Sequence, residues 1–293
     1  MNKLAVFIVL ILLVTACKQV DNKKSTTASD TTGWSGSAVT EQLRDVYHRF
    51  PTPEEMLAII DVKNLVYNPY LMNNPDKGKQ YFDSRAQALN LGVYVADLAY
   101  LSLFEQHNEA IRYFEVIYEL SDKLRISSAF DRALLGRIQD NLTNSDSLKV
   151  ISEEAFVSLS DYLESNDNEK VFAILSIGGF VEALYLSFSL AGDFHPDNPI
   201  VQQIADQKFV LENILEYSAL YSDDKNVSIT MEELAAIRSV YNELITEKIE
   251  TKVSRDNSGK LIIAGGDKLK MSEEQYNRLK AATLNTRKKI TQK

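Results

Sequence analysis

Apolar residues recur at helical spacing along most of the chain. Residues 111–124 and 234–245 are clear examples, with apolar side chains three or four positions apart and charged ones between them. This period places the apolar side chains on one face of a helix, where they can pack against a core. With few prolines and glycines to interrupt it, the pattern predicts an all-α fold.

Capping signals divide this pattern into separate helices. Asp197-Asn198-Pro199, like Thr52-Pro53, places a capping side chain before a proline at the first helical position. Thr230–Glu233 and Ser272–Gln275 have the spacing of a capping box. Amphipathic helices are therefore expected at residues 108–125, 128–142, 199–221 and 231–250.

Two stretches, residues 88–104 and 171–191, are apolar nearly all round, and they resemble each other. Leu-x-Leu-Gly-x-Tyr-Val-x-x-Leu at 89–98 matches Leu-x-Ile-Gly-x-Phe-Val-x-x-Leu at 175–184, 86 residues later. Six related residues in ten positions indicate an internal duplication. We expect a duplicated helical bundle of two related halves, residues 41–146 and 147–250, each of about four helices, with the apolar stretches at the centre.

The repeated glycines, Gly92 and Gly178, stand inside these two helices. A glycine in a helix interior costs about 1 kcal/mol relative to alanine, so close approach of two buried helices is the expected reason for it. Room for a ligand is the alternative. Because Asp97 and Glu182 interrupt the apolar stretches, and a charge at mid-bilayer costs at least about 2.5 kcal/mol, we expect core helices instead of membrane spans.

The C-terminal part, residues 251–293, differs from the rest. Short β-like runs at 251–254 and 260–264 flank Asp256-Asn257-Ser258-Gly259, which is turn chemistry. The sequence predicts a small β-hairpin here, followed by a last helix from Glu273 to about Lys289.

The N-terminus has the features of a targeting segment. A basic start, an apolar run from Leu4 to Val14 and small residues lead directly into Cys17, the single cysteine of the 293 residues. The run is too short to span a bilayer as a helix. Val14-Thr15-Ala16-Cys17 resembles the lipobox of bacterial lipoproteins, which implies a signal peptide at residues 1–16 and acyl chains such as palmitate on Cys17, giving a stable membrane anchor. Residues 17–40 are rich in polar and small residues and are expected to form a flexible tether.

The net charge limits the classes of partner that this chain can bind. The formal net charge is −9, which disfavours nucleic acid, whose binding requires Lys and Arg to neutralise phosphates. We expect contact with a membrane through the N-terminal lipid only, and a protein or other envelope component as the partner.

A search for reactive groups gives few candidates. The three histidines fit no metal motif, and phosphate loops and nucleophile elbows are missing, so we expect neither a metal nor a cofactor. Asp97 and Glu182 are the candidate catalytic residues, because a buried carboxylate must be paired, hydrogen-bonded or protonated. They are either structural, with Arg112, Arg132 or a tyrosine as partner, or a general acid/base pair between the halves. Three further tyrosines are candidates to line such a pocket: Tyr94, Tyr100 and Tyr185.

The stretches "FPTPEEML", "NPDKGKQYFDSRAQALNLGVYVADLAYLSLFEQ" and "DNLTNSDSLKVISEEAF" resemble a family of Bacteroidota lipoproteins of unknown function. The resemblance implies a cell-envelope lipoprotein on the cell membrane or outer membrane. "CKQVDNKK" lacks the acidic run that in such bacteria sends lipoproteins to the cell surface, which favours a periplasm-facing position.

These observations favour a non-enzymatic binding or scaffold module over an enzyme. The alternatives are a small-ligand binder or hydrolase that uses a cleft between the halves, and a scaffold of short helical repeats, for which the 34-residue period is missing.

Overall fold

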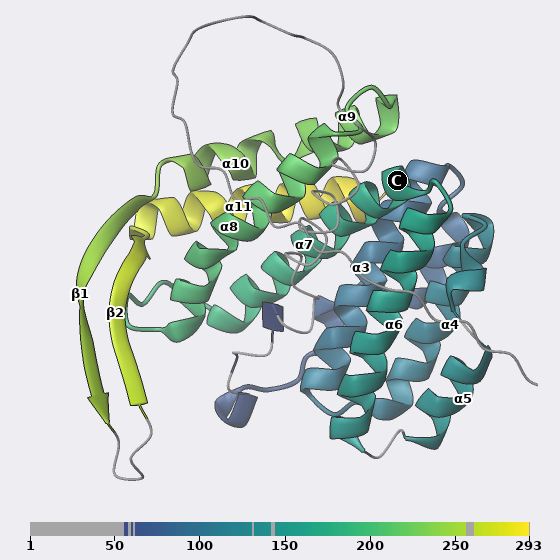
Figure 1. Cartoon of the computed structure of the whole chain (residues 1–293), viewed down its shortest axis with the longest axis horizontal. Helices are drawn as coiled ribbons and strands as arrows, with labels where there is room; N and C mark the ends of the chain where they lie inside the picture. Colours follow the sequence, from purple (N-terminus) through teal and green to yellow (C-terminus); the bar gives the residue numbers. More distant parts are fainter. Residues whose placement is uncertain are drawn as a thin grey trace, which may run out of the picture.

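A computed structural model describes residues 56–57, 60, 62–130, 132–141, 144–255 and 261–292. Over these residues the chain is mostly helical, with one two-stranded antiparallel sheet and a C-terminal helix (Figure 1). The predicted class, all-α with a small hairpin and a final helix, is therefore confirmed. The signal peptide, Cys17 and the tether lie outside the described residues, as do Thr52-Pro53 and the turn at residues 256–260.

The described helices follow one another with short connections. They are α3 (Ser84–Leu103), α4 (His107–Lys123), α5 (Arg132–Asp140), α6 (Ser145–Ser165), α7 (Glu169–Ala191), α8 (Pro199–Ala219), α9 (Lys225–Glu233), α10 (Ala235–Asn242) and α11 (Glu273–Thr291). The strands are β1 (Ile245–Arg255) and β2 (Leu261–Lys270), and short 3₁₀ helices occur at η1 (Val62–Asn64), η2 (Pro69–Leu71), η3 (Pro75–Gln80) and η4 (Ser127–Ala129).

The two apolar helices, α3 and α7, pack directly against each other in the centre of the domain. A Cβ on Gly92 would overlap the carbonyl oxygen of Leu175 and lie 2.6 Å from the backbone nitrogen of Gly179. A Cβ on Gly178 would overlap the carbonyl oxygen of Leu89. The predicted reason for the repeated glycines, close approach of two helix backbones, is thus confirmed.

These contacts are reciprocal. Each glycine faces the carbonyl of the residue three positions before the other glycine. Farther along, Asp97 of α3 meets Glu182 of α7, so contacts advance together along both helices and the two run in the same direction. Reciprocal contact between equivalent positions is what an approximate two-fold axis produces. The division into two duplicated halves stays a prediction, which this arrangement favours.

α7 is a core helix of this domain. Among the described residues it is the one helix long and apolar enough to cross a membrane, and 83% of its most apolar 18-residue window is buried inside the protein. Side chains of α3, α4, α8, α10 and α11 share one hydrophobic cluster with it. A smaller cluster, Leu134, Ile138 and Ile151, lies between α5 and α6.

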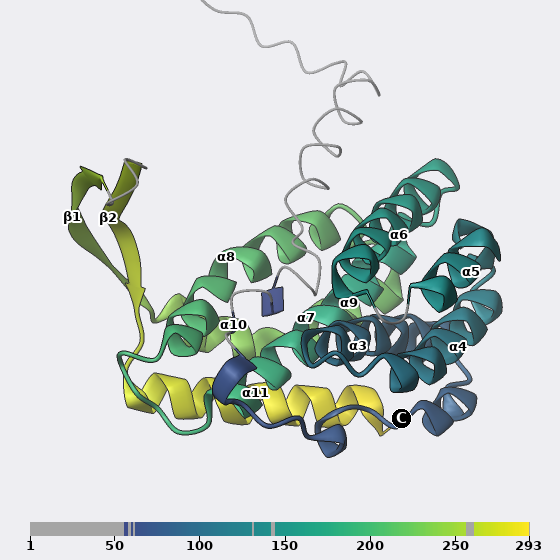
Figure 2. The ribbon, with the colours of Figure 1, turned by 90° about the horizontal axis from the view of Figure 1, so that it is seen from below.

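Residues 62–83, here called the strap, precede α3 and contain η1, η2 and η3. They run beside α11 along the lower edge of the molecule in Figure 2. Buried polar side chains hold their backbone: the Tyr94 hydroxyl donates to the Asn74 carbonyl at 2.9 Å, and the Tyr100 hydroxyl accepts from the Asn68 N–H at 3.1 Å. The strap lacks a helical pattern of its own, so these side chains fix its path.

Two of the expected capping signals act as predicted and one does not. Asn198 caps α8, and Ser272 and Gln275 form the capping box of α11. Thr230, however, lies inside α9, where its hydroxyl donates to the Asn226 carbonyl at 2.6 Å, and Asp224 is the cap. The helix expected at 231–250 is wrong in its second half, because α10 ends at Asn242 and strand β1 begins at Ile245.

The hairpin is longer than expected and extends away from the helical body (Figures 1 and 2). Its strands pair from Ile245 with Lys270 to Arg255 with Leu261, with an irregularity between Ile249 and Lys252. At its base β2 contacts α8, and the chain then turns into α11.

Candidate functional site

The two candidate carboxylates come together in the core. Asp97 of α3 and Glu182 of α7 are each 0% exposed, and their side chains interact directly. Two acidic residues in otherwise apolar helices meet because the helices run in the same direction from the glycine contact. The two carboxylates therefore meet, but inside the core, where neither of them lines the surface pockets along α8 or at the base of the hairpin; a shared cleft between the halves stays a prediction.

Arg287 of α11 supplies the positive charge. Its Nε and Nη2 donate to the two oxygens of Glu182 at 2.6 and 2.7 Å, which is a two-pronged ion pair. Its guanidinium also lies 4.0 Å from the ring centre of Tyr185 and donates to the Leu71 carbonyl at 2.9 Å. Burial lowers the pKa of Arg287, but the neighbouring Glu182 carboxylate raises this pKa by a larger amount, so the net shift is upward.

Asp97 has weaker partners. Its Oδ2 accepts from the Asn73 backbone N–H at 3.0 Å, while its Oδ1 is buried without a donor. Burial raises the pKa of Asp97 well above its ordinary value, and the nearby Glu182 charge raises it further, against the lowering effect of Arg287. One member of the pair is therefore an ion-paired carboxylate and the other is pushed towards its neutral form.

Of the structural partners expected for these carboxylates, Arg112 was wrong, and the side chain of Arg132 lies outside the described residues. Arg112 lies on α4 and pairs at 3.5 Å with Asp76, both exposed. The actual partner, Arg287, is 105 residues from Glu182. Nothing local in the sequence links the two positions, although an arginine on the last predicted helix could have been considered.

The three candidate tyrosines surround the pair, and the positions of their hydroxyls and rings favour a structural role. Tyr94 and Tyr100 are fully buried, with their hydroxyls bonded to the strap. Tyr185 is half-buried beneath the Arg287 guanidinium. Within the described residues, three surface pockets adjoin α8, and none of these tyrosines and neither carboxylate lines any of them.

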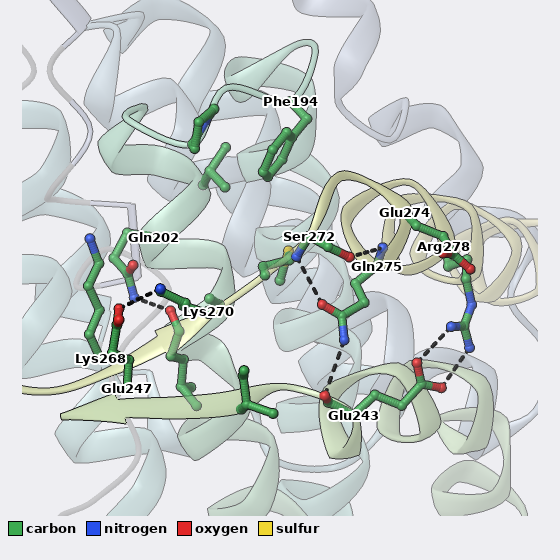
Figure 3. Close-up of a pocket in the computed structure, with 16 residues that line it drawn as sticks. Phe194, Gln202, Glu243, Glu247, Lys268, Lys270, Ser272, Glu274, Gln275 and Arg278 are labelled. Atoms are coloured by element: carbon green, nitrogen blue, oxygen red, sulfur yellow. Dashed lines mark hydrogen bonds and ion pairs between the residues drawn. The ribbon is translucent and has the colours of Figure 1, made fainter.

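A second candidate site is a surface pocket at the base of the hairpin, which the sequence did not point to (Figure 3). Its volume is about 670 Å³. It is lined by the α7–α8 connection, α8, both strands and the start of α11. The lining residues include Phe194, Gln202, Ile245, Lys268 and Arg278. Two further pockets lie along α8, one facing α10 and one near Pro196.

Polar contacts fix the walls of this pocket, as Figure 3 shows. Arg278 donates through both terminal nitrogens to Glu243 at 2.7 Å, and this raises the pKa of Arg278 and lowers that of Glu243. The Gln275 side chain donates to the Glu243 carbonyl at 3.1 Å while its oxygen accepts from the Ser272 N–H. These contacts clasp the end of α10, which leads into β1, to the start of α11, which follows β2.

The pocket is lined by exposed apolar side chains and by charged side chains in ion pairs. Ile245 is 68% exposed, so its side chain offers an apolar surface at the pocket. Lys270 is paired with Glu247 at 2.8 Å, and Gln202 donates to the Leu269 carbonyl at 3.3 Å. Such a surface suits binding, since a few placed polar groups orient what the apolar groups hold.

Among the described residues, no group of three or more His, Cys, Asp or Glu side chains is placed to hold a metal ion. Comparison of the chain with family models, curated proteins and solved structures gives no match.

Proposed function

We propose that this chain is a lipid-anchored helical protein of the bacterial cell envelope that binds a partner protein through its hairpin and the pocket at the hairpin base. In this proposal it is a binding or scaffold module and catalyses no reaction. The lipid on Cys17 holds it to the cell membrane or outer membrane, and the domain faces the periplasm.

The projecting hairpin carries the proposal. Within the described residues it is a two-stranded sheet, so each strand has one edge without a strand neighbour. A free edge is a template for pairing with another chain, which proteins usually block. An isolated hairpin is also marginally stable in water, so a long one is best explained by a partner that adds to it.

The way the base is built supports the same proposal. Gln275 and Arg278 donate to Glu243, and the Ser272 N–H donates to Gln275; this clasp fixes where the ribbon leaves the body. A partner that added a strand to the ribbon would reach the pocket beside Ile245 and Phe194. Main-chain pairing would then provide affinity, and the pocket would provide specificity.

The rival, a small-ligand binder or hydrolase, is favoured by one observation, the convergence of Asp97 and Glu182. General acid/base chemistry needs the carboxyl within hydrogen-bond reach of a substrate. Both side chains are fully buried, and Arg287 and Asn73 already occupy three of their four oxygens. Structural use accounts for these contacts without a substrate.

The test compares three forms of the full chain. In one variant residues 248–267 are replaced by Asn-Gly. This keeps the strand pairing at the base of the hairpin, including that of Ile245 with Lys270. The control variant changes two exposed α6 side chains, Val150→Ser and Val157→Ser. Each form is cross-linked in cells and its adducts are quantified by mass spectrometry.

We expect a protein adduct that the wild type and the control share and the shortened hairpin loses. An adduct profile that is unchanged by shortening the hairpin, with all three forms folded and anchored, would contradict the proposal. The rival would gain if a small molecule copurified with the wild type and was lost on Asp97→Asn.

A further inference from the structure

The buried cluster in the core contains more acids than bases. Asp97 and Glu182 contribute two carboxyl groups, both fully buried, and Arg287 contributes one guanidinium whose side chain is 15% exposed. If both acids were ionised, the cluster would carry a net negative charge away from water. An uncompensated buried charge is costly, and such a group usually takes up a proton instead.

The hydrogen bonds indicate where that proton belongs. Both oxygens of Glu182 already accept from Arg287, at 2.6 and 2.7 Å. Asp97 accepts one backbone N–H on Oδ2, and its Oδ1 has no donor. Two carboxyl groups in contact offer only acceptors to each other unless one of them is protonated. A proton on Asp97 would give its free oxygen a partner in Glu182.

We propose that Asp97 is the neutral acid in the native protein, that it donates its proton in a hydrogen bond to Glu182, and that this proton leaves Arg287 free to hold the strap at the Leu71 carbonyl. The site thus binds one proton that an unfolded chain releases. It is independent of the partner site at the hairpin.

The surroundings of Asp97 agree with this assignment. Glu182 from α7 and Arg287 from α11 are the charged groups that act on it most strongly, and Glu182 opposes its ionisation. Tyrosine hydroxyls face it from the strap, from α4 and from its own helix, and burial raises the pKa of each of them, so they add no charge: Tyr81, Tyr113, Tyr94 and Tyr100.

The strap is tied to both members of the pair. The Asn73 N–H donates to Asp97, and the Leu71 carbonyl accepts from the same Arg287 nitrogen that serves Glu182. If Asp97 lost its proton, it would repel Glu182 and compete for Arg287. The contact of Arg287 with the Leu71 carbonyl would then weaken, whereas the Asn73 N–H, which favours the ionised form of Asp97, would stay bonded to it.

The pH dependence has a definite sign. An exposed aspartate titrates near about 3.9, and burial raises the pKa of Asp97 in the native state. The native state therefore holds more protons than the unfolded chain over the interval between these two values. The stabilisation is complete below the lower value and is lost as the pH rises through the higher one.

The direct test is infrared spectroscopy of the full chain at a pH of about 6, where an exposed aspartate is ionised. We expect a carbonyl band of a protonated carboxyl in wild type that is lost in Asp97→Asn. It should persist in Glu154→Gln, which alters the exposed ion pair with Arg137. In Glu182→Gln the band should also be lost, since Asp97 would then pair with Arg287 alone.

Thermal unfolding provides the second measurement. Asparagine mimics the neutral acid, so the melting temperature of wild type minus that of Asp97→Asn should fall as pH rises from about 4 and then become constant. A wild type without the band, or a band that Asp97→Asn retains, would overturn the proposal. So would a constant difference in melting temperature. If Glu182→Gln does not fold, the infrared and melting-temperature comparisons of wild type with Asp97→Asn still test the proposal.

Discussion

Gly92 and Gly178 occupy equivalent places on α3 and α7, and each faces the backbone carbonyl three residues before the other, Leu175 and Leu89 respectively. This reciprocal contact sets the distance between the two central helices. The same pairing places Asp97 beside Glu182 farther along, so the close approach of the helices and the buried acid pair are two results of one packing arrangement.

The glycine contact predicts that alanine is not tolerated at either position. In Gly92→Ala or Gly178→Ala the new methyl group would overlap backbone atoms, which cannot rotate away. Overpacking costs about 1–3 kcal/mol even where side chains can adjust, so we expect at least that loss in the free energy of unfolding measured with urea.

Gly136→Ala is the matched control, because nothing lies within 4 Å of a Cβ there and the residue is in α5. There alanine should stabilise the protein by up to about 1 kcal/mol through helix propensity. Equal effects at Gly92 and Gly136 would argue against a close helix contact.

Removal of the buried cation should be strongly destabilising. Arg287→Met would leave Glu182 without its ion pair inside the core, and breaking a buried pair from one side costs about 3–5 kcal/mol. Arg137→Met breaks an exposed pair with Glu154 instead, which should cost less than about 1 kcal/mol. Urea unfolding followed by circular dichroism measures both, and similar losses for the two variants would contradict the structural role of Arg287.

The clasp at the hairpin base predicts a local effect. Ser272→Ala removes the N-cap of α11 and one half of the capping box, which should lower the free energy of unfolding by about 1 kcal/mol. Amide exchange should rise around Gln275 and Glu243. Ser222→Ala, an exposed serine after α8, should change stability by no more than about 0.5 kcal/mol. Unchanged exchange in Ser272→Ala would mean that the box does not hold the base.

The proposed anchor predicts a defined N-terminus. Intact-mass and peptide spectra of the protein from its native cells should show residues 1–16 removed and acyl chains on Cys17. Cys17→Ser should move the protein from the membrane fraction to the soluble fraction, since the acyl chains supply the membrane affinity. An unmodified amino terminus in wild type would exclude the anchor.

Local patterns were enough to predict much of the fold. The all-α class, the caps of α8 and α11, the hairpin and the glycine contact each depend on a few neighbouring residues. The capping box expected at Thr230 failed because this residue fits it locally but bonds inside α9, where tertiary packing buries it. The helix expected at 231–250 was wrong in its second half because the chain from Ile245 pairs with β2, a contact that its own periodicity does not encode.

The sites were harder to predict, since they join distant segments. The acid pair was a hypothesis from two carboxylates in apolar helices, but its cation comes from the last helix, 105 residues from Glu182. The strap has no periodic pattern, so its attachment through Asn73 and Leu71 had no sequence signal. The hairpin pocket needs α8, the ribbon and α11 together, and no short motif encodes that arrangement.

The central claim is that the hairpin base is a protein-binding surface. The most direct measurement replaces Ile245, exposed and in the pocket, with a photo-cross-linking amino acid in cells. The control places the same amino acid at Val157, an exposed residue of α6, a helix that lies away from the hairpin (Figure 2). The account expects one reproducible protein adduct from position 245 and none from 157. No adduct at 245, or the same adducts at both positions, would contradict it.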